Sequence, residues 1–282
     1  MDLYEKIQNG VQDLPTLPTV YSALSDAMAK PSSTAEEIAE IVSADQASAF
    51  RVLKVVNSAF YGFPGRIDSI SRAVVILGFD EIRNLILATS VMDIFGKRDS
   101  ALDFRPGDFW AHSIAVGLLT RMIGQAAGVV AQENLFVAGV VHDIGKLAFF
   151  ELAEEEFARA LSYAAERNCP IRDAEQEVLG LDHAQAGMLL AEQWRLPLSL
   201  KNAIRFHHEG RVANKPDAVV GAVHVADFVA RALEMGYPGD SLVPQPNEQV
   251  WESLRMREKA FEEAVPGLMR QYQDTIGLLL HS

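Results

Sequence analysis

Apolar residues recur at helical spacing along almost the whole chain, and we find no convincing alternation of apolar and polar positions of the kind typical of strands. The pattern predicts a short amphipathic segment over residues 1–13, followed by helices separated by brief polar or proline-containing turns. We expect helices over residues 19–30, 34–43, 46–56, 71–77, 80–95, 108–119, 134–151, 154–167, 170–179, 183–196, 197–208 and 217–234, with two more within 247–280. The predicted fold class is therefore all-α.

Polar residues mark several of the predicted helix starts. The stretch Ser33-Thr34-Ala35-Glu36 has the form of a capping box, in which two orphan backbone N–H groups are satisfied by side chains. Asp45, Asp108 and Asp182 each stand directly before an apolar-periodic stretch, which favours them as N-caps. The segments 210–216 and 236–246 carry glycine and proline and are expected to be loops.

The most polar interruption of the helical pattern is Gly96 to Asp103, and we take it as the boundary between two helical subdomains. The first would span residues 1–100, and the second, residues 101–282, holds all the candidate metal ligands described below. No internal repeat is visible.

Composition and charge narrow the classes of function. The chain has 282 residues, 49% of them hydrophobic, and a formal net charge of −13, which argues against a nucleic-acid binder because such a protein needs a basic face. A local metal can still attract a small anionic ligand. The single cysteine excludes an internal disulfide, and neither a signal-type segment nor a membrane-spanning apolar run is visible. We therefore expect a cytoplasmic protein that binds neither nucleic acid nor membrane.

The segment Val140 to Leu147 is apolar except for His142, Asp143, Gly145 and Lys146. A buried carboxylate without a partner is costly, so Asp143 needs a cation or hydrogen-bond donors. An imidazole next to a carboxylate is a mixed nitrogen and oxygen ligand set that suits a transition metal. Hydrogen bonds between packed helices would satisfy the same pair without a metal, and this dipeptide alone does not separate the two interpretations.

Further candidate ligands are spread over the second half of the chain. Each has an alternative when taken singly: His112 as a core histidine, His183 at a helix end, His207-His208 as a solvated helix terminus, and Asp227 paired with His224 one turn earlier. Together they exceed what one tetrahedral zinc requires and suit a two-metal site with Asp143 as a bridging ligand. The candidate metal ligands are His112, His142, Asp143, His183, His207, His208 and Asp227.

His112, His142-Asp143 and Asp227 in an all-helical frame resemble the HD superfamily of metal-dependent phosphohydrolases, and Asp182-His183, Gly187 and His207-His208-Glu209 are similar to its HD-GYP subgroup. That resemblance implies that His112, His142, Asp143 and Asp227 hold a first metal. It implies that His183, His207 and His208 hold a second, with Lys146 contacting substrate phosphate. The Gly-Tyr-Pro loop of that subgroup is missing after Glu209. A literal Gly236-Tyr237-Pro238 follows Asp227, and we interpret it as coincidental.

The first half resembles a narrower family, the HDOD domain of bacterial signalling proteins. The likeness is carried over residues 14–210 by Leu14-Pro15-Thr16-Leu17-Pro18, by Asp45 with Arg51-Val52-Leu53, by Asn57 to Gly62 and by Ala73 with Ile76 to Phe79. It implies a regulatory module, and this chain keeps the full ligand set that many such domains lack.

Two functions are therefore expected, ahead of a helical scaffold that holds no metal. The first is a bacterial signal-transduction module with an HD-type core that holds two divalent ions and acts by binding a signalling protein. The alternative is a metal-dependent phosphohydrolase or cyclic-dinucleotide phosphodiesterase, in which Asp143 and Lys146 would be catalytic and a small phosphate-containing ligand would bind. Iron, manganese, zinc and nickel all suit such ligands, and oligomeric state is not predicted.

Overall fold

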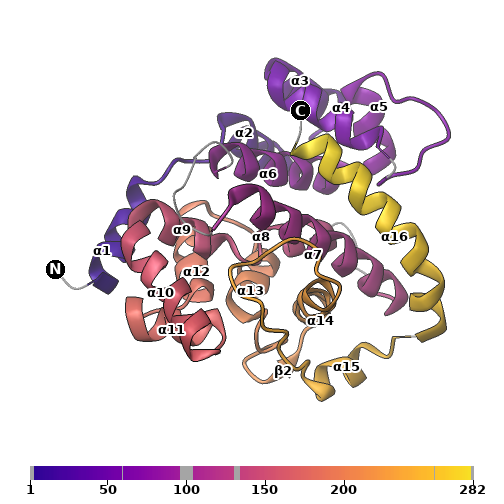
Figure 1. Cartoon of the computed structure of the whole chain (residues 1–282). Coiled ribbons are helices and arrows are strands. Elements are labelled where there is room, and N and C mark those ends of the chain that lie inside the picture. Colours follow the sequence, from indigo (N-terminus) through magenta and orange to yellow (C-terminus); the bar gives the residue numbers. More distant parts are fainter. Residues whose placement is uncertain (1–2, 59, 96–103, 130–133, 257, 281–282) are drawn as a thin grey trace. The chain divides into compact units, whose positions relative to one another are not determined.

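The computed structural model describes residues 3–58, 60–95, 104–129, 134–256 and 258–280, which form helices and one two-stranded hairpin (Figure 1). The all-α prediction is confirmed. The chain divides into two compact units, described separately below: unit 1 comprises residues 1–15 and 97–264, and unit 2 comprises residues 16–96 and 265–282. The boundary predicted at Gly96 to Asp103 lies outside the described residues. Among the described residues, no helix combines the length and apolar character needed to cross a bilayer.

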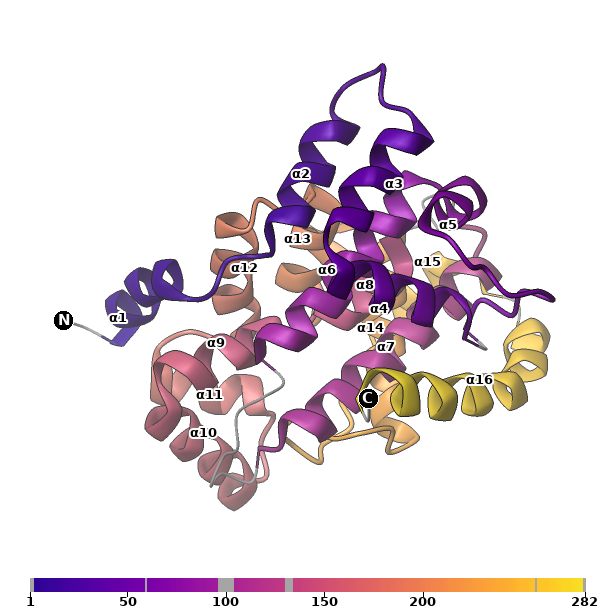
Figure 2. The same ribbon diagram turned by 90° about the horizontal axis from the view of Figure 1, so that it is seen from above.

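In unit 2, α3 packs against α5 and against α2, and α4 packs against α6. Figure 2 shows α2 and α3 side by side. The helices of this unit are α2 (Thr19–Met28), α3 (Ala35–Ala44), α4 (Gln46–Val56), α5 (Ile70–Leu77), α6 (Phe79–Phe95) and the part of α16 (Glu258–Leu279) from residue 265 onward.

The caps of unit 2 agree with the sequence at one helix and differ at another. Asp45 caps α4, because its carboxylate accepts hydrogen bonds from the N–H groups of Ala47 (3.1 Å) and Ser48 (3.3 Å). The capping box expected at residues 33–36 is wrong, because the N-cap is Thr34, whose side chain accepts the N–H of Glu37 at 3.2 Å. The hydroxyl of Ser33 is used elsewhere, as it donates to the carbonyl of Ala27.

In unit 1, α7 packs along both α8 and α14, and α9 packs against α12. Helices α10 and α11 lie side by side, as Figure 1 shows. The elements of this unit are α1 (Leu3–Gly10), the 3-10 turn η1 (Val11–Asp13), α7 (Pro106–Ala126), α8 (Leu135–Val141), α9 (Ile144–Leu152), α10 (Glu154–Arg167), α11 (Ile171–Leu179), α12 (His183–Gln193), α13 (Leu198–Phe206), β1 (Arg211–Val212), β2 (Lys215–Pro216), α14 (Ala218–Ala232), α15 (Glu248–Leu254) and the first residues of α16.

Close approach of helix backbones in unit 1 depends on two glycines. A Cβ atom on Gly139 of α8 would lie 2.6 Å from the Cα of Gly117 on α7, and one on Gly145 of α9 would lie 1.8 Å from the carbonyl oxygen of His183 on α12. Only a residue without a side chain fits at either point. The result is that α7, α8, α9 and α12 bring their backbones together around the interior of the unit.

Three predictions for unit 1 were wrong in detail. Helix α7 begins at Pro106, a residue suited to the first helical position, so Asp108 lies inside the helix and does not cap it. The single helix expected over 134–151 is two helices, because the backbone leaves helical geometry at Asp143 (φ −103°, ψ 13°). The loop expected at 210–216 contains the hairpin β1–β2, whose turn residues Ala213 and Asn214 both have positive φ.

Candidate metal centre

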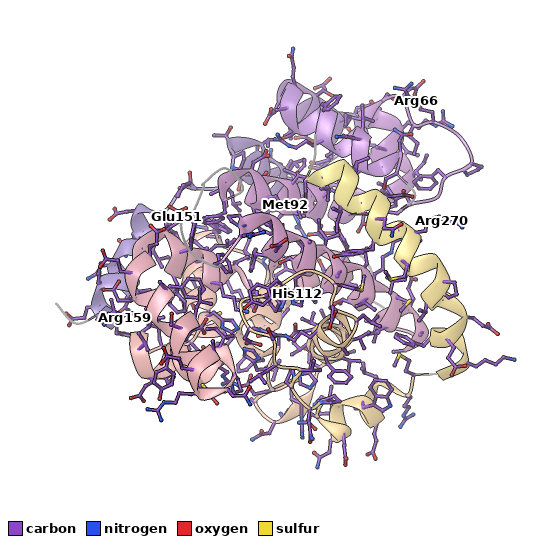
Figure 3. The ribbon with its side chains drawn as sticks, viewed as in Figure 1. Arg66, Met92, His112, Glu151, Arg159 and Arg270 are labelled. Carbon is purple, nitrogen blue, oxygen red and sulfur yellow. The ribbon has the colours of Figure 1, made fainter. Side chains whose placement is uncertain are left out.

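The structure brings all seven candidate ligands together within unit 1, and Figure 3 shows His112 among its helices. Their ligand atoms form three overlapping triads, each within 4.8 Å. We call the first the aspartate group (His112, His142 and Asp227) and the second the histidine group (His183, His207 and His208). The third triad joins His142, Asp143 and His207. The ligands come from α7, the α8–α9 turn, the start of α12, the end of α13, and α14. Their binding of metal stays a prediction.

Asp143 lies between the two groups. Its Oδ1 atom is 3.1 Å from Nε2 of His183 and 3.4 Å from Nε2 of His207, while its Oδ2 atom is 3.4 Å from Nε2 of His142. A carboxylate that faces both groups with different oxygens has the arrangement that a bridging ligand requires.

Two of the histidines are oriented by the helices that they end. His142 is the C-cap of α8 and His207 is the C-cap of α13, and each Nδ1–H donates to the carbonyl three residues earlier, at 2.7 Å to Gly139 and 2.9 Å to Ile204. This contact satisfies a helix-end carbonyl and fixes the tautomer at once. In a neutral imidazole so held, Nε2 carries the lone pair and points toward Asp143.

Glu175 on α11 holds His183 in the same way and was missed by the sequence analysis. Its fully buried carboxylate accepts the backbone N–H of His183 at 2.9 Å and faces Nδ1 at 2.5 Å. A carboxylate behind a ligating histidine is a recurrent feature of metal sites. A signal was present in the sequence, because Glu175 occupies the apolar face of α11 with Ile171, Ala174 and Leu179.

Burial and neighbouring charges keep most of these groups in the protonation state that metal binding needs. Burial alone would raise the pKa of Asp143, but His142 and Lys146 hold it well below its usual value. Burial lowers the pKa of His207 to about 4 and lowers those of His112 and His208 as well. These imidazoles are therefore neutral at pH 7.

His183 is the exception. Burial would lower its pKa too, but the carboxylates of Glu175 and Asp143 together outweigh burial and raise it to about 9. Without a metal, His183 is therefore an imidazolium at pH 7, and a bound ion has to displace its Nε2 proton.

Two buried cations contact the carboxylates of the cluster. The fully buried Lys146 places Nζ 2.6 Å from Oδ2 of Asp143. Arg231 places Nε 2.9 and 3.2 Å from the two oxygens of Asp227. Burial would raise the pKa of Asp227, but Arg231 together with His112 and His142 holds it well below its usual value. His224 is not the partner of Asp227, contrary to the alternative in the sequence analysis. Its Nδ1 donates to the carbonyl of His207 at 2.8 Å.

The arrangement of buried ligand atoms in the cluster fits a divalent metal. Nε2 of His142 is buried and makes no hydrogen bond to any described residue, and Oδ1 of Asp143 is buried facing the ring nitrogens of His183 and His207. Acceptors that converge in a buried space without donors are costly, and a cation resolves that cost. Imidazole nitrogens mixed with carboxylate oxygens are typical of transition-metal ligands.

The segment Gly236-Tyr237 supports the cluster through the backbone. Tyr237 N–H donates to the carbonyl of Asp108 at 3.0 Å, and a Cβ atom on Gly236 would lie 2.2 Å from the backbone nitrogen of His112. With φ at +76°, Gly236 adopts a conformation that favours glycine. This segment therefore packs against α7 at the turn that carries His112.

Comparisons with known proteins give one family. The model of the HDOD domain matches residues 14–210. A relative from Treponema pallidum (strain Nichols) with no characterised function is 28% identical over 244 residues, and these cover 85% of this chain and 46% of the relative. The chain thus spans about half the length of that relative.

Solved structures show the same fold. An HDOD domain protein of unknown function from Geobacter sulfurreducens is 25% identical with a TM-score of 0.84, covering 99% of this chain and 97% of the other. A Shewanella amazonensis SB2B structure whose name suggests a phosphohydrolase is 24% identical with a TM-score of 0.76, covering 97% and 98%. Because the family model matches more than half of the chain, the resemblance noted in the sequence is confirmed, and this protein belongs to the HDOD domain family.

Proposed function

We propose that the protein is a cytoplasmic bacterial signal-transduction module that holds divalent metal ions in the candidate cluster of unit 1 and acts by binding a protein partner. One observation carries the metal part of this proposal. Three imidazoles whose Nδ1 atoms are held by acceptors, on His142, His183 and His207, direct Nε2 toward a buried carboxylate. Family membership supports the signalling part.

The burial of the cluster favours a structural or sensory metal over a catalytic one. The side chains of His142, Asp143, His183 and His207 are each at most 1% exposed, so a phosphodiester has no open path to them in this conformation. Lys146, the residue expected to meet substrate phosphate, is instead fully buried against Asp143. Half-buried His208 is the most exposed of the seven candidates.

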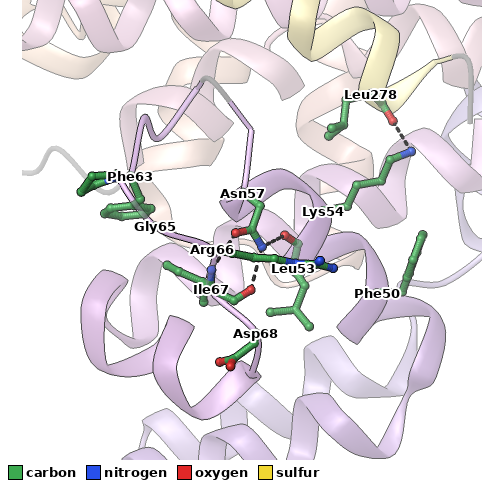
Figure 4. Close-up of a pocket in the computed structure, with 11 residues that line it drawn as sticks. Phe50, Leu53, Lys54, Asn57, Phe63, Gly65, Arg66, Ile67, Asp68 and Leu278 are labelled. Atoms are coloured by element: carbon green, nitrogen blue, oxygen red, sulfur yellow. Dashed lines mark hydrogen bonds between the residues drawn. The ribbon is translucent and has the colours of Figure 1, made fainter.

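A pocket in unit 2 supports the partner-binding part. It has a volume of about 770 Å³ and lies between α4, the segment 63–68 and Leu278 (Figure 4). Phe50 on its edge is 68% exposed, and Lys54 and Arg66 are the cations among its lining residues. Asn57 fixes the segment by bonding both the N–H and the carbonyl of Ile67 at 2.7 Å. A partner segment with an apolar side chain and a carboxylate would match these residues.

A metal-dependent phosphohydrolase or cyclic-dinucleotide phosphodiesterase is the second candidate, and the position of Asp143 between two groups of ligand atoms favours it. In that case the ions would lower the pKa of a bound water and polarise a phosphoryl oxygen. Asp143 would bridge the ions. Lys146 would have to leave Oδ2 of Asp143 to meet a phosphate oxygen.

Metal analysis tests the proposal directly. Protein purified without chelator is expected to carry on the order of one to two divalent ions per chain, and His207→Ala is expected to lower that content. Metal-free protein at full folding would refute the metal part. Assays with cyclic dinucleotides and generic phosphodiesters, with manganese or iron added, separate the two candidates. Turnover that is lost in Asp143→Ala but kept in the surface variant Glu177→Gln would favour the enzyme.

A further inference from the structure

The two outer groups of the cluster are held by their surroundings in different ways. We infer that the histidine group with Asp143 binds the first divalent ion and that Arg231, held by Asp240, keeps the aspartate group the weaker site. This inference rests on the proposed function, because it ranks sites within the same cluster.

The histidine group is arranged for metal before any ion arrives. Nδ1 of His183 faces Glu175 and Nδ1 of His207 donates to Ile204, so both rings already direct Nε2 at Oδ1 of Asp143. That oxygen faces ring nitrogens, whereas Lys146 lies on the other oxygen of the same carboxylate. An ion here would bind ring nitrogens and the one carboxylate oxygen of Asp143 that Lys146 leaves uncontacted, whereas Arg231 contacts both oxygens of Asp227.

The aspartate group is arranged differently, beginning with His112. Its Nε2 lies 3.0 Å from Oδ1 of Asp227, whereas its Nδ1 is buried with no hydrogen-bond partner among the described residues. Because a carboxylate oxygen accepts, Nε2 of His112 carries a proton and donates it to Asp227. For His112 to bind an ion through Nε2, that proton has to move to Nδ1, where no described acceptor waits.

Arg231 adds a competing charge. Its side chain is only 6% exposed, and its Nε contacts both oxygens of Asp227 at 2.9 and 3.2 Å. A guanidinium does not lose its proton in a protein, so this positive charge is permanent. An ion that enters the aspartate group therefore meets a carboxylate whose charge is already compensated and a fixed cation beside it.

Asp240 prevents Arg231 from moving away easily. Its Oδ1 accepts a hydrogen bond from Nη1 of Arg231 at 2.7 Å and from the N–H of Leu242 at 3.1 Å, and its Oδ2 accepts the N–H of Ile171 at 3.0 Å. Asp240 contacts none of the seven candidate ligands in these interactions. It acts through Arg231, and we assign it as a positioning residue for the aspartate group.

Titration of the chelator-stripped full chain with Mn²⁺, followed by calorimetry and by electron paramagnetic resonance, tests this ranking. The wild type is expected to bind one ion tightly and a second at least about tenfold more weakly. Residues that contact metal ligands typically change metal affinity by about that factor. The double variant Arg231→Gln/Asp240→Asn removes a buried cation and a buried anion together. It is expected to tighten the second step about tenfold and leave the first unchanged.

Arg172→Gln is the matched control. Arg172 also bridges two carboxylates, Asp182 at 3.0 Å and Glu209 at 2.9 Å, but neither is a candidate ligand. It should leave the second step as in the wild type. Equal affinities in the wild type, or a second step unchanged in the double variant, would overturn the inference. No Mn²⁺ binding at all would instead refute the proposed function.

A measurement on the wild type avoids any effect of the substitutions on folding. Crystals grown with one equivalent of Mn²⁺ should show an anomalous peak within the histidine group and none within the aspartate group. A peak confined to the aspartate group, or equal peaks in both, would contradict the ranking.

Discussion

Replacing Gly145 by alanine is expected to damage both the stability of unit 1 and its metal cluster. The added Cβ would lie 1.8 Å from the carbonyl oxygen of His183 and 2.6 Å from the backbone nitrogen of Gly187. Both obstacles are backbone atoms of α12, so no side-chain rotation relieves the clash. Helices α9 and α12 have to move apart until that contact exceeds 3.0 Å, a change of more than 1 Å.

The magnitude follows from this displacement. Overpacking of a well-packed interior costs typically about 1–3 kcal/mol, and a rigid backbone obstacle places Gly145→Ala at the upper end. In a chain of this size, about 3 kcal/mol corresponds to a fall in Tm of roughly 6–12 °C. The same movement carries His183 away from Asp143, where functional sites tolerate only about 0.5 Å. Metal affinity should therefore fall together with stability.

The assay is thermal unfolding, with metal content measured on the same samples. Gly107→Ala is the matched control, because Gly107 also lies in a helix of unit 1 and an added Cβ there meets nothing within 4 Å. It should be neutral or stabilising by up to about 1 kcal/mol. Equal Tm values for the two variants, with full metal content in Gly145→Ala, would refute the helix contact described here.

Three further predictions concern other parts of the chain. Glu175→Gln keeps the shape of the side chain that holds His183 but removes its charge. Metal affinity measured above pH 9, where His183 is deprotonated, should therefore fall about tenfold. The exposed Glu177→Gln should leave metal affinity unchanged. Addition of a chelator should lower the Tm of the wild type, because an ion that binds only the folded state stabilises that state. The Tm of Asp143→Ala should not change, and an equal fall in both proteins would contradict this prediction. Asp45→Ala should cost about 1 kcal/mol at pH 7 through loss of the α4 cap. Burial would raise the folded-state pKa of Asp45, but hydrogen bonds from Ser48 and Ala47 outweigh it and lower that pKa. The contribution of Asp45 to stability is therefore present above pH 3.8 and is lost as the pH falls through the lowered pKa. Acid unfolding of the wild type and of Asp45→Ala would detect this loss.

The helices were predictable because periodicity and caps are local properties of the sequence. Residues 154–167 form a helix with the predicted ends, and Asp182 caps α12 in a complete capping box. The displaced cap at Thr34 and the start of α7 at Pro106 show the limit of local reasoning. Neighbouring residues with similar capping ability compete, and the choice depends on packing that the sequence does not display.

The ligand residues were predictable by type, but not the contacts that organise them. Arg231 stands four residues after Asp227 on α14, a helical spacing that the sequence displays, but Asp240 lies beyond that helix and more than 100 residues from His112. Glu175 carried a local signal, a carboxylate on an apolar helix face, which was not recognised. The break between α8 and α9 was hidden because its residues continue an apolar run that reads as one helix.

That break is itself part of the site. If residues 134–151 formed one continuous helix, the carbonyl of Gly139 would accept the N–H of Asp143, four residues later, and would not be available to His142. Ending α8 at Val141 frees this carbonyl for Nδ1 of His142, and the end of α13 frees the carbonyl of Ile204 for His207. The same histidine then caps the helix and turns its other nitrogen toward the cluster. The ends of α8 and α13 would need hydrogen-bond donors for their last carbonyls in any case, and His142 and His207 supply them. The same contacts orient Nε2 of each ring toward the cluster, which explains why these two histidines stand at helix ends and not within helices.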